Sequence, residues 1–175
     1  MNLLREAPLW AQLLLVAILF VAAAQDIVRR QISNWLCLAV VIAAIAIAIA
    51  NGPTLALWQN GLIFALLLAI GTPLFAAGWL GGGDVKLLAA VGLWADFSAI
   101  LALLACILIA GGVLAAISMA VRGGRAARRA KGVPYGVAIA VGAAIVLLRP
   151  ALFEARSEQH SPLDLKAARE RTALR

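Results

Sequence analysis

The stretch Gly81-Gly82-Gly83-Asp84-Val85-Lys86 decides the fold of this chain, because it places an acid between two long apolar runs. A second acid, Asp26, directly follows the first apolar run. An ionisable side chain at membrane depth costs about 2.5–3.5 kcal/mol even on a lenient insertion scale, so each acid is a candidate for function. Glycines allow backbone conformations that other residues resist, and they let another segment approach closely. The three glycines before Asp84 therefore predict a pocket at this point.

The composition of the whole chain predicts a membrane protein. Of its 175 residues, 65% are hydrophobic and 13% are charged, whereas soluble domains are about 45–50% apolar and about 25% charged. We therefore expect an all-α, polytopic membrane protein with about six transmembrane helices. Residues 1–150 are expected to form this six-span membrane domain, and residues 151–175 a polar C-terminal tail that is weakly helical or disordered.

Apolar runs mark the six spans. A perpendicular span needs roughly 20 apolar residues, so the second, fourth and sixth runs are short, and the fourth needs protein rather than lipid around it. The first run could also be a signal peptide with a cleavage site at Ala22-Ala23-Ala24. Cleavage would leave Asp26 almost at the new N-terminus, so we expect an uncleaved span. The expected spans cover about residues 8–24, 35–50, 55–80, 85–95, 97–121 and 133–148.

The placement of basic residues predicts how these spans are oriented. With the N-terminus outside, one side receives all the basic loops: Arg29 and Arg30, Lys86, and the segment 122–131. The two loops on the other side carry no Lys or Arg, so the positive-inside rule places the basic side in the cytoplasm. Asp26 and Asp84, which are two full spans apart, then lie at the same cytoplasmic face. The net charge of +7 accordingly indicates contact with anionic membrane lipids and not with nucleic acid.

Several other chemistry-bearing residues are expected to have no role in a site. Cys37 and Cys106 lie in apolar runs without a Cys or His neighbour at ligand spacing, and His160 lies in the polar tail. We therefore expect no metal and no cofactor. Asp96 is expected to be a turn residue at the opposite face. The tryptophans lie near predicted span ends, where aromatic belts form: Trp10, Trp35, Trp58, Trp79 and Trp94.

Two carboxylates at one membrane face suggest proteolysis. Carboxylates that lie close together cannot both ionise readily, so they hold one proton over a broad pH range. The ionised member can take a proton from water while the protonated member polarises a peptide carbonyl, which is aspartic-protease chemistry. A plainer reading makes Asp26 a solvated interfacial acid beside Arg29 and Arg30. For Lys86, similarly, the sequence favours an interfacial anchor whose charged end reaches the membrane surface over a catalytic group.

Three segments resemble the signatures of one family, the type IV prepilin peptidases. The segment Asp26-Ile27-Val28-Arg29-Arg30-Gln31-Ile32-Ser33-Asn34 resembles their first aspartate segment, in which an Asp and a basic stretch precede Ile-Pro-Asn. The segment Gly81-Gly82-Gly83-Asp84-Val85-Lys86-Leu87-Leu88 is similar to their Gly-x-Gly-Asp motif. Val133-Pro134-Tyr135-Gly136 is similar to a third signature that opens the last span. The ordered set covers about residues 8–148, and Ser33 stands where the family often has proline.

The resemblance implies a membrane-embedded aspartic endopeptidase of the short type that serves Flp (Tad) pili. Such an enzyme would cleave the leader peptide of type IV prepilins or pseudopilins at the cytoplasmic face of the bacterial inner membrane. Its partners would be the prepilin, membrane lipids and the pilus or secretion assembly machinery. The longer members carry a domain with paired Cys-x-x-Cys motifs and also methylate the pilin, and nothing here corresponds to that domain. The catalytic residues implied are Asp26 and Asp84, and the site-shaping residues implied are Gly81, Gly83, Lys86, Asn34, Pro134 and Gly136.

Two other functions stay open at the level of the sequence. A small transporter or channel could use Asp26 and Asp84 to move protons or cations across the membrane. A degenerate assembly partner in a pilus or secretion machine would need neither acid. Conduction does not require the segment 133–136, so the three ordered motifs favour the peptidase.

Overall fold

Helices make up the fold, and no strand occurs in the described part of the chain. The computed structural model describes residues 2–52, 57–122 and 135–158. This confirms the expected all-α class. In chain order the helices are α1 (Leu3–Glu6), α2 (Leu9–Arg29), α3 (Asn34–Ala50), α4 (Leu57–Ala76), α5 (Gly82–Gly92), α6 (Phe97–Arg122) and α8 (Tyr135–Glu158).

Among the described residues, three helices are long and apolar enough to cross a membrane: α2, α4 and the Phe97–Ala120 part of α6. The helix α3 and the Tyr135–Leu147 part of α8 are apolar but shorter. The chain is therefore built as a membrane protein, while the number of six spans stays a prediction. The predicted roles of residues 123–134 in the basic loop and 159–175 in the tail fall outside the described residues.

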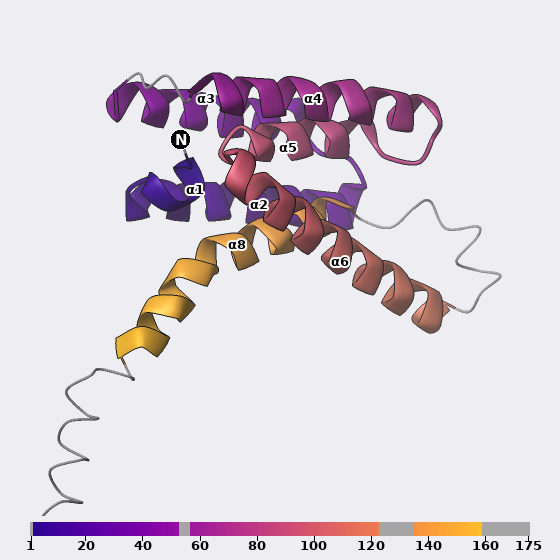
Figure 1. Cartoon of the computed structure of the whole chain (residues 1–175). Helices are drawn as coiled ribbons and strands as arrows, with labels where there is room; N and C mark the ends of the chain where they lie inside the picture. Colours follow the sequence, from indigo (N-terminus) through magenta and orange to yellow (C-terminus); the bar gives the residue numbers. More distant parts are fainter. Residues whose placement is uncertain (1, 53–56, 123–134, 159–175) are drawn as a thin grey trace, which may run out of the picture.

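The short helix α5 lies in the middle of the bundle. With 11 residues it is about 16 Å long, roughly half the hydrocarbon thickness of a bilayer. It packs against α3, α4 and α8, and Figure 1 shows α3 and α4 above it and α2 and α8 below it. Leu87, Ala89, Ala90 and Val91 of α5 are fully buried. Protein therefore surrounds this helix, as its length requires.

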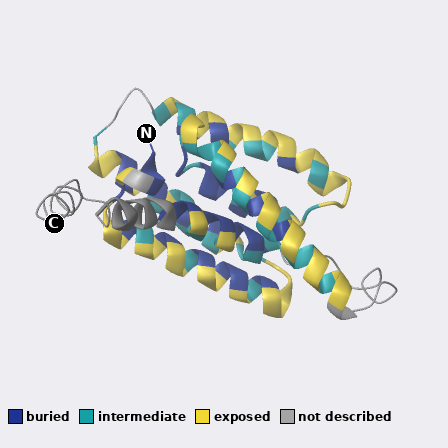
Figure 2. Cartoon of the chain, turned by 60° about the horizontal axis from the view of Figure 1, so that its bottom comes forward, coloured by how far each residue is buried: buried dark blue, intermediate teal, exposed yellow. Residues whose placement is uncertain are grey.

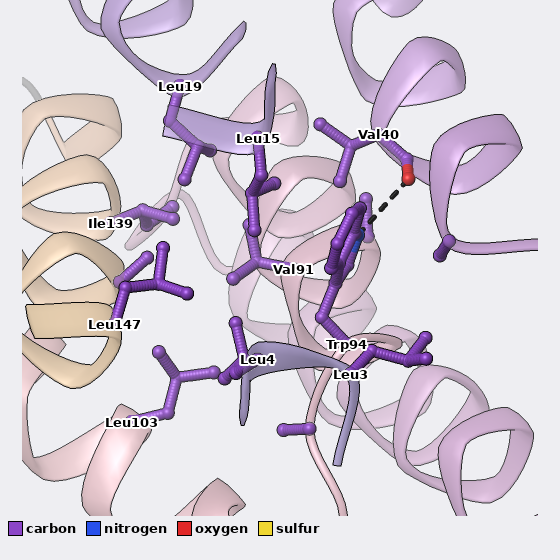
Figure 3. Packing of buried hydrophobic residues seen from close by; sticks show 14 of the residues in the cluster. Leu3, Leu4, Leu15, Leu19, Val40, Val91, Trp94, Leu103, Ile139 and Leu147 are labelled. Atoms are coloured by element: carbon purple, nitrogen blue, oxygen red, sulfur yellow. Dashed lines mark hydrogen bonds between the residues drawn. The ribbon is translucent and has the colours of Figure 1, made fainter. Parts of the chain in front are cut away.

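The apolar core joins α5 to its neighbours through small and branched side chains. Trp94, just after α5, is fully buried, and its indole N–H donates a hydrogen bond to the carbonyl of Val40 at 3.2 Å (Figure 3). The prediction that Trp94 belongs to an interfacial aromatic belt is therefore wrong, because a buried indole with a satisfied N–H is a core residue. Figure 2 shows exposed residues on the outer sides of the helices, where lipid would lie.

The ends of α2 and α5 determine where the two acids lie. The helix α2 continues to Arg29, so Asp26 belongs to its last turn and does not follow it. The helix α5 begins at Gly82, which places Asp84 in its first turn. Figure 1 shows the connections after α2 and after α4 at the same end of the bundle, at the right, with α1 at the other end. Both acids therefore lie at one end, as the alternating topology predicts.

The contact between α6 and α8 depends on a glycine. A methyl group on Gly142 of α8 would lie 2.8 Å from the backbone nitrogen and 2.9 Å from the Cα of Ile107 of α6. Backbone atoms cannot move aside easily, so Gly142→Ala is expected to destabilise the protein by about 1–3 kcal/mol, the usual cost of overpacking. Thermal unfolding in detergent should show this as a lower midpoint.

The control for this substitution is Gly112→Ala in α6. Gly112 belongs to a run of small residues that predicts close helix packing, yet a methyl group there meets nothing within 4 Å. Gly112→Ala should leave the unfolding midpoint unchanged or slightly raised, because alanine favours helix more than glycine does. Equal midpoints for the two variants would contradict the close contact at Gly142.

Candidate active site

Asp26 is held by the first turn of α8. The backbone N–H of Gly136 donates a hydrogen bond of 2.7 Å to Asp26 Oδ2, across 110 residues of sequence. The backbone of Val137 and the charge of Arg30 also interact with this carboxyl group. Asp26 is only 6% exposed, so it is not a solvated interfacial acid. The packing of α2 against α8 therefore fixes the first predicted catalytic residue.

Asp84 reaches the same point from α5. The backbones of Gly81 and Gly136 both interact with its carboxyl group, and so does the charge of Asp26. Its Oδ1 is buried and has no hydrogen-bond partner among the described residues. Gly136 thus faces both acids, which brings the ends of α2 and α5 together at the start of α8. The structure therefore places the two predicted catalytic aspartates in one site.

Asp84 lies outside the helices that are long enough to cross a membrane, and its surroundings favour the protonated form. Burial, and after it the neighbouring Asp26 carboxylate, raise the pKa of Asp84 to about 6. Burial disfavours the charged form, and a second negative charge disfavours it further. Near pH 6 this carboxyl group therefore exists in both its protonated and its ionised form.

This pKa predicts that activity falls in alkaline solution. Above about pH 6 Asp84 loses its proton, so it can no longer give a proton to a carbonyl oxygen. The kcat/KM for peptide cleavage should therefore fall as the pH rises from about 6 to about 8, approaching tenfold per pH unit. A profile that is flat over this range would contradict a role for protonated Asp84 in cleavage.

The titration of Asp84 can also be followed without activity. Carbodiimides react with protonated carboxyl groups, so labelling of Asp84, read by mass spectrometry, should decline with a midpoint near its pKa of about 6. In the Asp26→Asn variant this midpoint should move to lower pH, because one of the two causes that raise the pKa is removed.

The glycine run before Asp84 is required at two of its three positions. A methyl group on Gly81 would lie 2.6 Å from Asp84 Oδ2, and one on Gly83 would lie 3.0 Å from the Cβ of Ile32. A methyl group on Gly82 would meet only the ring of Phe75, at 3.2 Å, and Phe75 is 53% exposed. The spacing Gly-x-Gly-Asp thus follows from close contacts on both sides of the acid.

Gly81→Ala is expected to reduce cleavage strongly, and Gly82→Ala only slightly. Gly81 has a φ of −73° and a ψ of 142°, so alanine fits its backbone, and the substitution acts by displacing the Asp84 carboxylate. A misplacement of about 1 Å can cost roughly 100-fold in rate. The measurement is the cleavage rate of both variants at equal membrane abundance. Similar rates for the two variants would count against this account.

Lys86 and Asn34 connect α5 to α3 beside the site. Lys86 Nζ donates a hydrogen bond of 2.9 Å to Asn34 Oδ1, and both residues are exposed. The side chain is thus engaged in a bridge between two helix starts, which fits the site-shaping role implied for both residues. Pro134, the remaining site-shaping residue implied by the resemblance, lies outside the described residues.

Two residues for which the sequence implied no role also lie at the site. Ile32, in the connection between α2 and α3, lies against both Gly83 and Gly136. Cys37 is buried, and its thiol lies 3.9 Å from the carbonyl of Gly83 as a weak donor. Ile32 stands in the segment that resembles Ile-Pro-Asn, but the resemblance implied no role for it, and a cysteine in an apolar helix is unremarkable by type. Their positions in space show what they contact.

Asp96 lies away from this site and caps a helix. Its Oδ1 accepts hydrogen bonds from the backbone N–H groups of Ser98 and Ala99, at the start of α6. This confirms its predicted role in a turn. Within the described ranges, no three His, Cys, Asp or Glu side chains come together as a metal site would require. The described part of the site consists of two carboxyl groups and the backbone groups that hold them.

Comparison with known families identifies the chain. The family model described as the type IV leader peptidase family matches residues 13–117, which is more than half of the chain and includes both acids. The chain belongs to the type IV leader peptidase family. Membership in the leader peptidase family implies a peptidase whose substrate is a prepilin. Comparisons with curated proteins and with solved structures give no significant match. Gly136 lies beyond the matched range, so its place in the site rests on its contact with Asp26.

Proposed function

We propose that this protein is an aspartic endopeptidase that removes the leader peptide of Flp-type prepilins or pseudopilins. It acts at the cytoplasmic face of the bacterial inner membrane, with residues 1–150 as the catalytic domain and 151–175 as a polar tail. One observation carries the proposal: the backbone of Gly136 faces both Asp26 and Asp84, in a chain of the leader peptidase family. Two carboxyl groups that face the same backbone donor are arranged for the proton sharing that metal-free peptide hydrolysis uses.

The surroundings of the two acids support different roles for them. Asp26 Oδ2 accepts a short hydrogen bond from a backbone N–H, which suits the ionised form. Asp84 Oδ1 is buried without a described partner, and burial raises the pKa of Asp84 to about 6. We therefore assign Asp26 as the base that activates water and Asp84 as the acid that protonates the carbonyl oxygen.

Hydrolysis then proceeds in two balanced steps. Water attacks the carbonyl carbon, gives one proton to Asp26, and the carbonyl oxygen receives the proton of Asp84, which yields a neutral tetrahedral diol. In the second step Asp26 gives its proton to the amide nitrogen, the carbon–nitrogen bond breaks, and one hydroxyl of the diol returns its proton to Asp84. The products are a carboxylic acid and an amine, and both aspartates regain their starting states.

The location of the site supports an action on membrane-anchored substrates. Both acids lie at one end of a bundle of apolar helices, together with Arg29, Arg30 and Lys86. A substrate whose apolar helix lies in the membrane would present the bond that follows its leader at this depth. We propose no methyl transfer, because the two cysteines of the chain both lie in apolar helices and form no Cys-x-x-Cys pair.

The proposal is tested by expressing the chain together with a candidate Flp-type prepilin and determining the pilin N-terminus by mass spectrometry. The pilin should lose its leader only in membranes that contain the chain, and the new N-terminus gives the cleaved bond directly. A panel of prepilins whose leaders all stay intact would contradict the proposal. Ion flux in proteoliposomes that depends on Asp26 and Asp84 would then favour the transporter.

A further inference from the structure

We propose that Ile32 is a positioning residue that sets the separation of the two catalytic carboxyl groups. This inference rests on the proposed function, because it assigns Ile32 a part in the action of Asp26 and Asp84. Ile32 is partly buried and packs against the apolar core. It touches no reacting atom in this account, so it acts through the segments that carry the acids.

The side chain of Ile32 lies between the starts of α5 and α8. A methyl group on Gly83 would lie 3.0 Å from Ile32 Cβ, 3.3 Å from its carbonyl oxygen and 3.4 Å from its nitrogen. A methyl group on Gly136 would lie 3.0 Å from Ile32 Cδ1. The base of the side chain thus meets the residue before Asp84, and its tip meets the residue that donates to Asp26.

The connection that carries Ile32 is itself fixed to the helix of Asp26. Arg30 ends α2 in the left-handed conformation with a φ of 51°, and its N–H donates to the carbonyl of Asp26 at 2.9 Å. On the other side of Ile32, the N–H of Ser33 donates to Gln25 Oε1 at 3.3 Å, and the Ser33 hydroxyl accepts from the N–H of Trp35. Hydrogen bonds of Arg30 and Ser33, which lie on either side of Ile32, therefore attach the connection to α2 and to the start of α3.

This arrangement makes the shape of Ile32 a determinant of the site. A β-branched side chain has few rotamers, so it acts as a spacer of fixed size between Gly83 and Gly136. With alanine the spacer shortens by three carbon atoms, the start of α5 is no longer supported against α8, and the geometry of the acids relaxes. Catalysis depends strongly on such geometry, because about 1 Å of displacement can cost roughly 100-fold in rate.

The test compares Ile32→Ala with Ile32→Val and with a matched control, Ile100→Ala. Ile100 of α6 is also partly buried against the core, but it follows Asp96 at the other end of the bundle. For each protein, kcat, KM and the thermal unfolding midpoint are measured in proteoliposomes. The substrate is an intact prepilin that the wild-type protein cleaves. The midpoint pH of carbodiimide labelling at Asp84 is measured separately and needs no activity.

Ile32→Ala should lower kcat by roughly 10- to 100-fold, with KM changed by no more than about twofold. The labelling midpoint should move to higher pH, because a shorter spacer lets the Asp26 and Asp84 carboxyl groups approach each other. Ile32→Val should recover kcat in part, because it keeps the Cβ contact with Gly83 but lacks the Cδ1 that meets Gly136. Ile100→Ala should keep kcat despite a similar loss of thermal stability. Equal kcat in the two alanine variants, or no recovery with valine, would overturn the inference. If the wild type cleaves no prepilin, the proposed function is refuted, but the labelling experiment still tests the positioning role because it needs no activity. An unchanged labelling midpoint in Ile32→Ala would overturn the positioning role.

Discussion

Replacing Asp84 with Asn is expected to abolish leader cleavage, and Asp26→Asn should do the same. Asparagine keeps the size of the side chain but can neither take a proton from water nor deliver one to the carbonyl oxygen. General acid–base catalysis contributes roughly 10²–10⁴-fold, and the two acids act as a unit, so each variant should lose at least about 10³-fold. The measurement is the fraction of pilin that carries its leader, determined by mass spectrometry at equal membrane levels of each variant.

The third aspartate of the described residues, Asp96, supplies the control. Asp96 accepts hydrogen bonds from the backbone N–H groups of Ser98 and Ala99, and asparagine caps a helix about as well as aspartate. Asp96→Asn should therefore leave cleavage close to the wild-type level. Near-normal cleavage by Asp26→Asn or Asp84→Asn would remove that residue from the mechanism, and loss of cleavage in all three variants would indicate an unspecific effect of removing acids.

Gly136→Ala is expected to have the second largest effect, although no charge changes. The added methyl group would lie 2.8 Å from Asp26 Oδ2 and 3.0 Å from Asp26 Cβ, and also 3.0 Å from Ile32 Cδ1. Asp26 Cβ is attached directly to the backbone, so relief requires α2 and α8 to move apart or the carboxyl group to rotate away from the Gly136 N–H. Either change displaces the base, and we expect a loss of roughly 100-fold in kcat.

The control for Gly136→Ala is Gly61→Ala in α4. A methyl group at Gly61 meets nothing within 4 Å, and the exchange favours helix by about 1 kcal/mol at either position. Gly61→Ala should therefore keep full cleavage and an equal or higher unfolding midpoint. If Gly136→Ala also cleaved at the wild-type rate, the close contact of Gly136 with Asp26 would not be what positions the Asp26 carboxylate for catalysis.

The sequence predicted the acids of the site but few of the contacts around them. Asp26 and Asp84 stand out because acids are rare in apolar runs, and the alternating topology placed them at one end of the bundle, where the structure has them. In the run Gly111-Gly112, Gly111 lies against Tyr135 and Ala138 of α8, whereas Gly112 meets nothing within 4 Å. A small residue allows close packing only on the face of its helix that meets another helix. The prediction that Trp94 lies in an interfacial aromatic belt was wrong, because a position after a span does not show whether lipid or protein covers the side chain.

The sequence by itself determined the membrane class, the helical fold, the family signatures and the identity of the two acids. These follow from local properties, namely hydrophobicity summed over a span and the cost of a charge within it. Only the tertiary structure decided that Gly136 faces both acids, what each glycine of the Gly-x-Gly-Asp motif contacts, and that Ile32 lies between two of these segments. These facts join residues up to 110 positions apart, and such contacts depend on how α2, α5 and α8 pack, which no local pattern encodes.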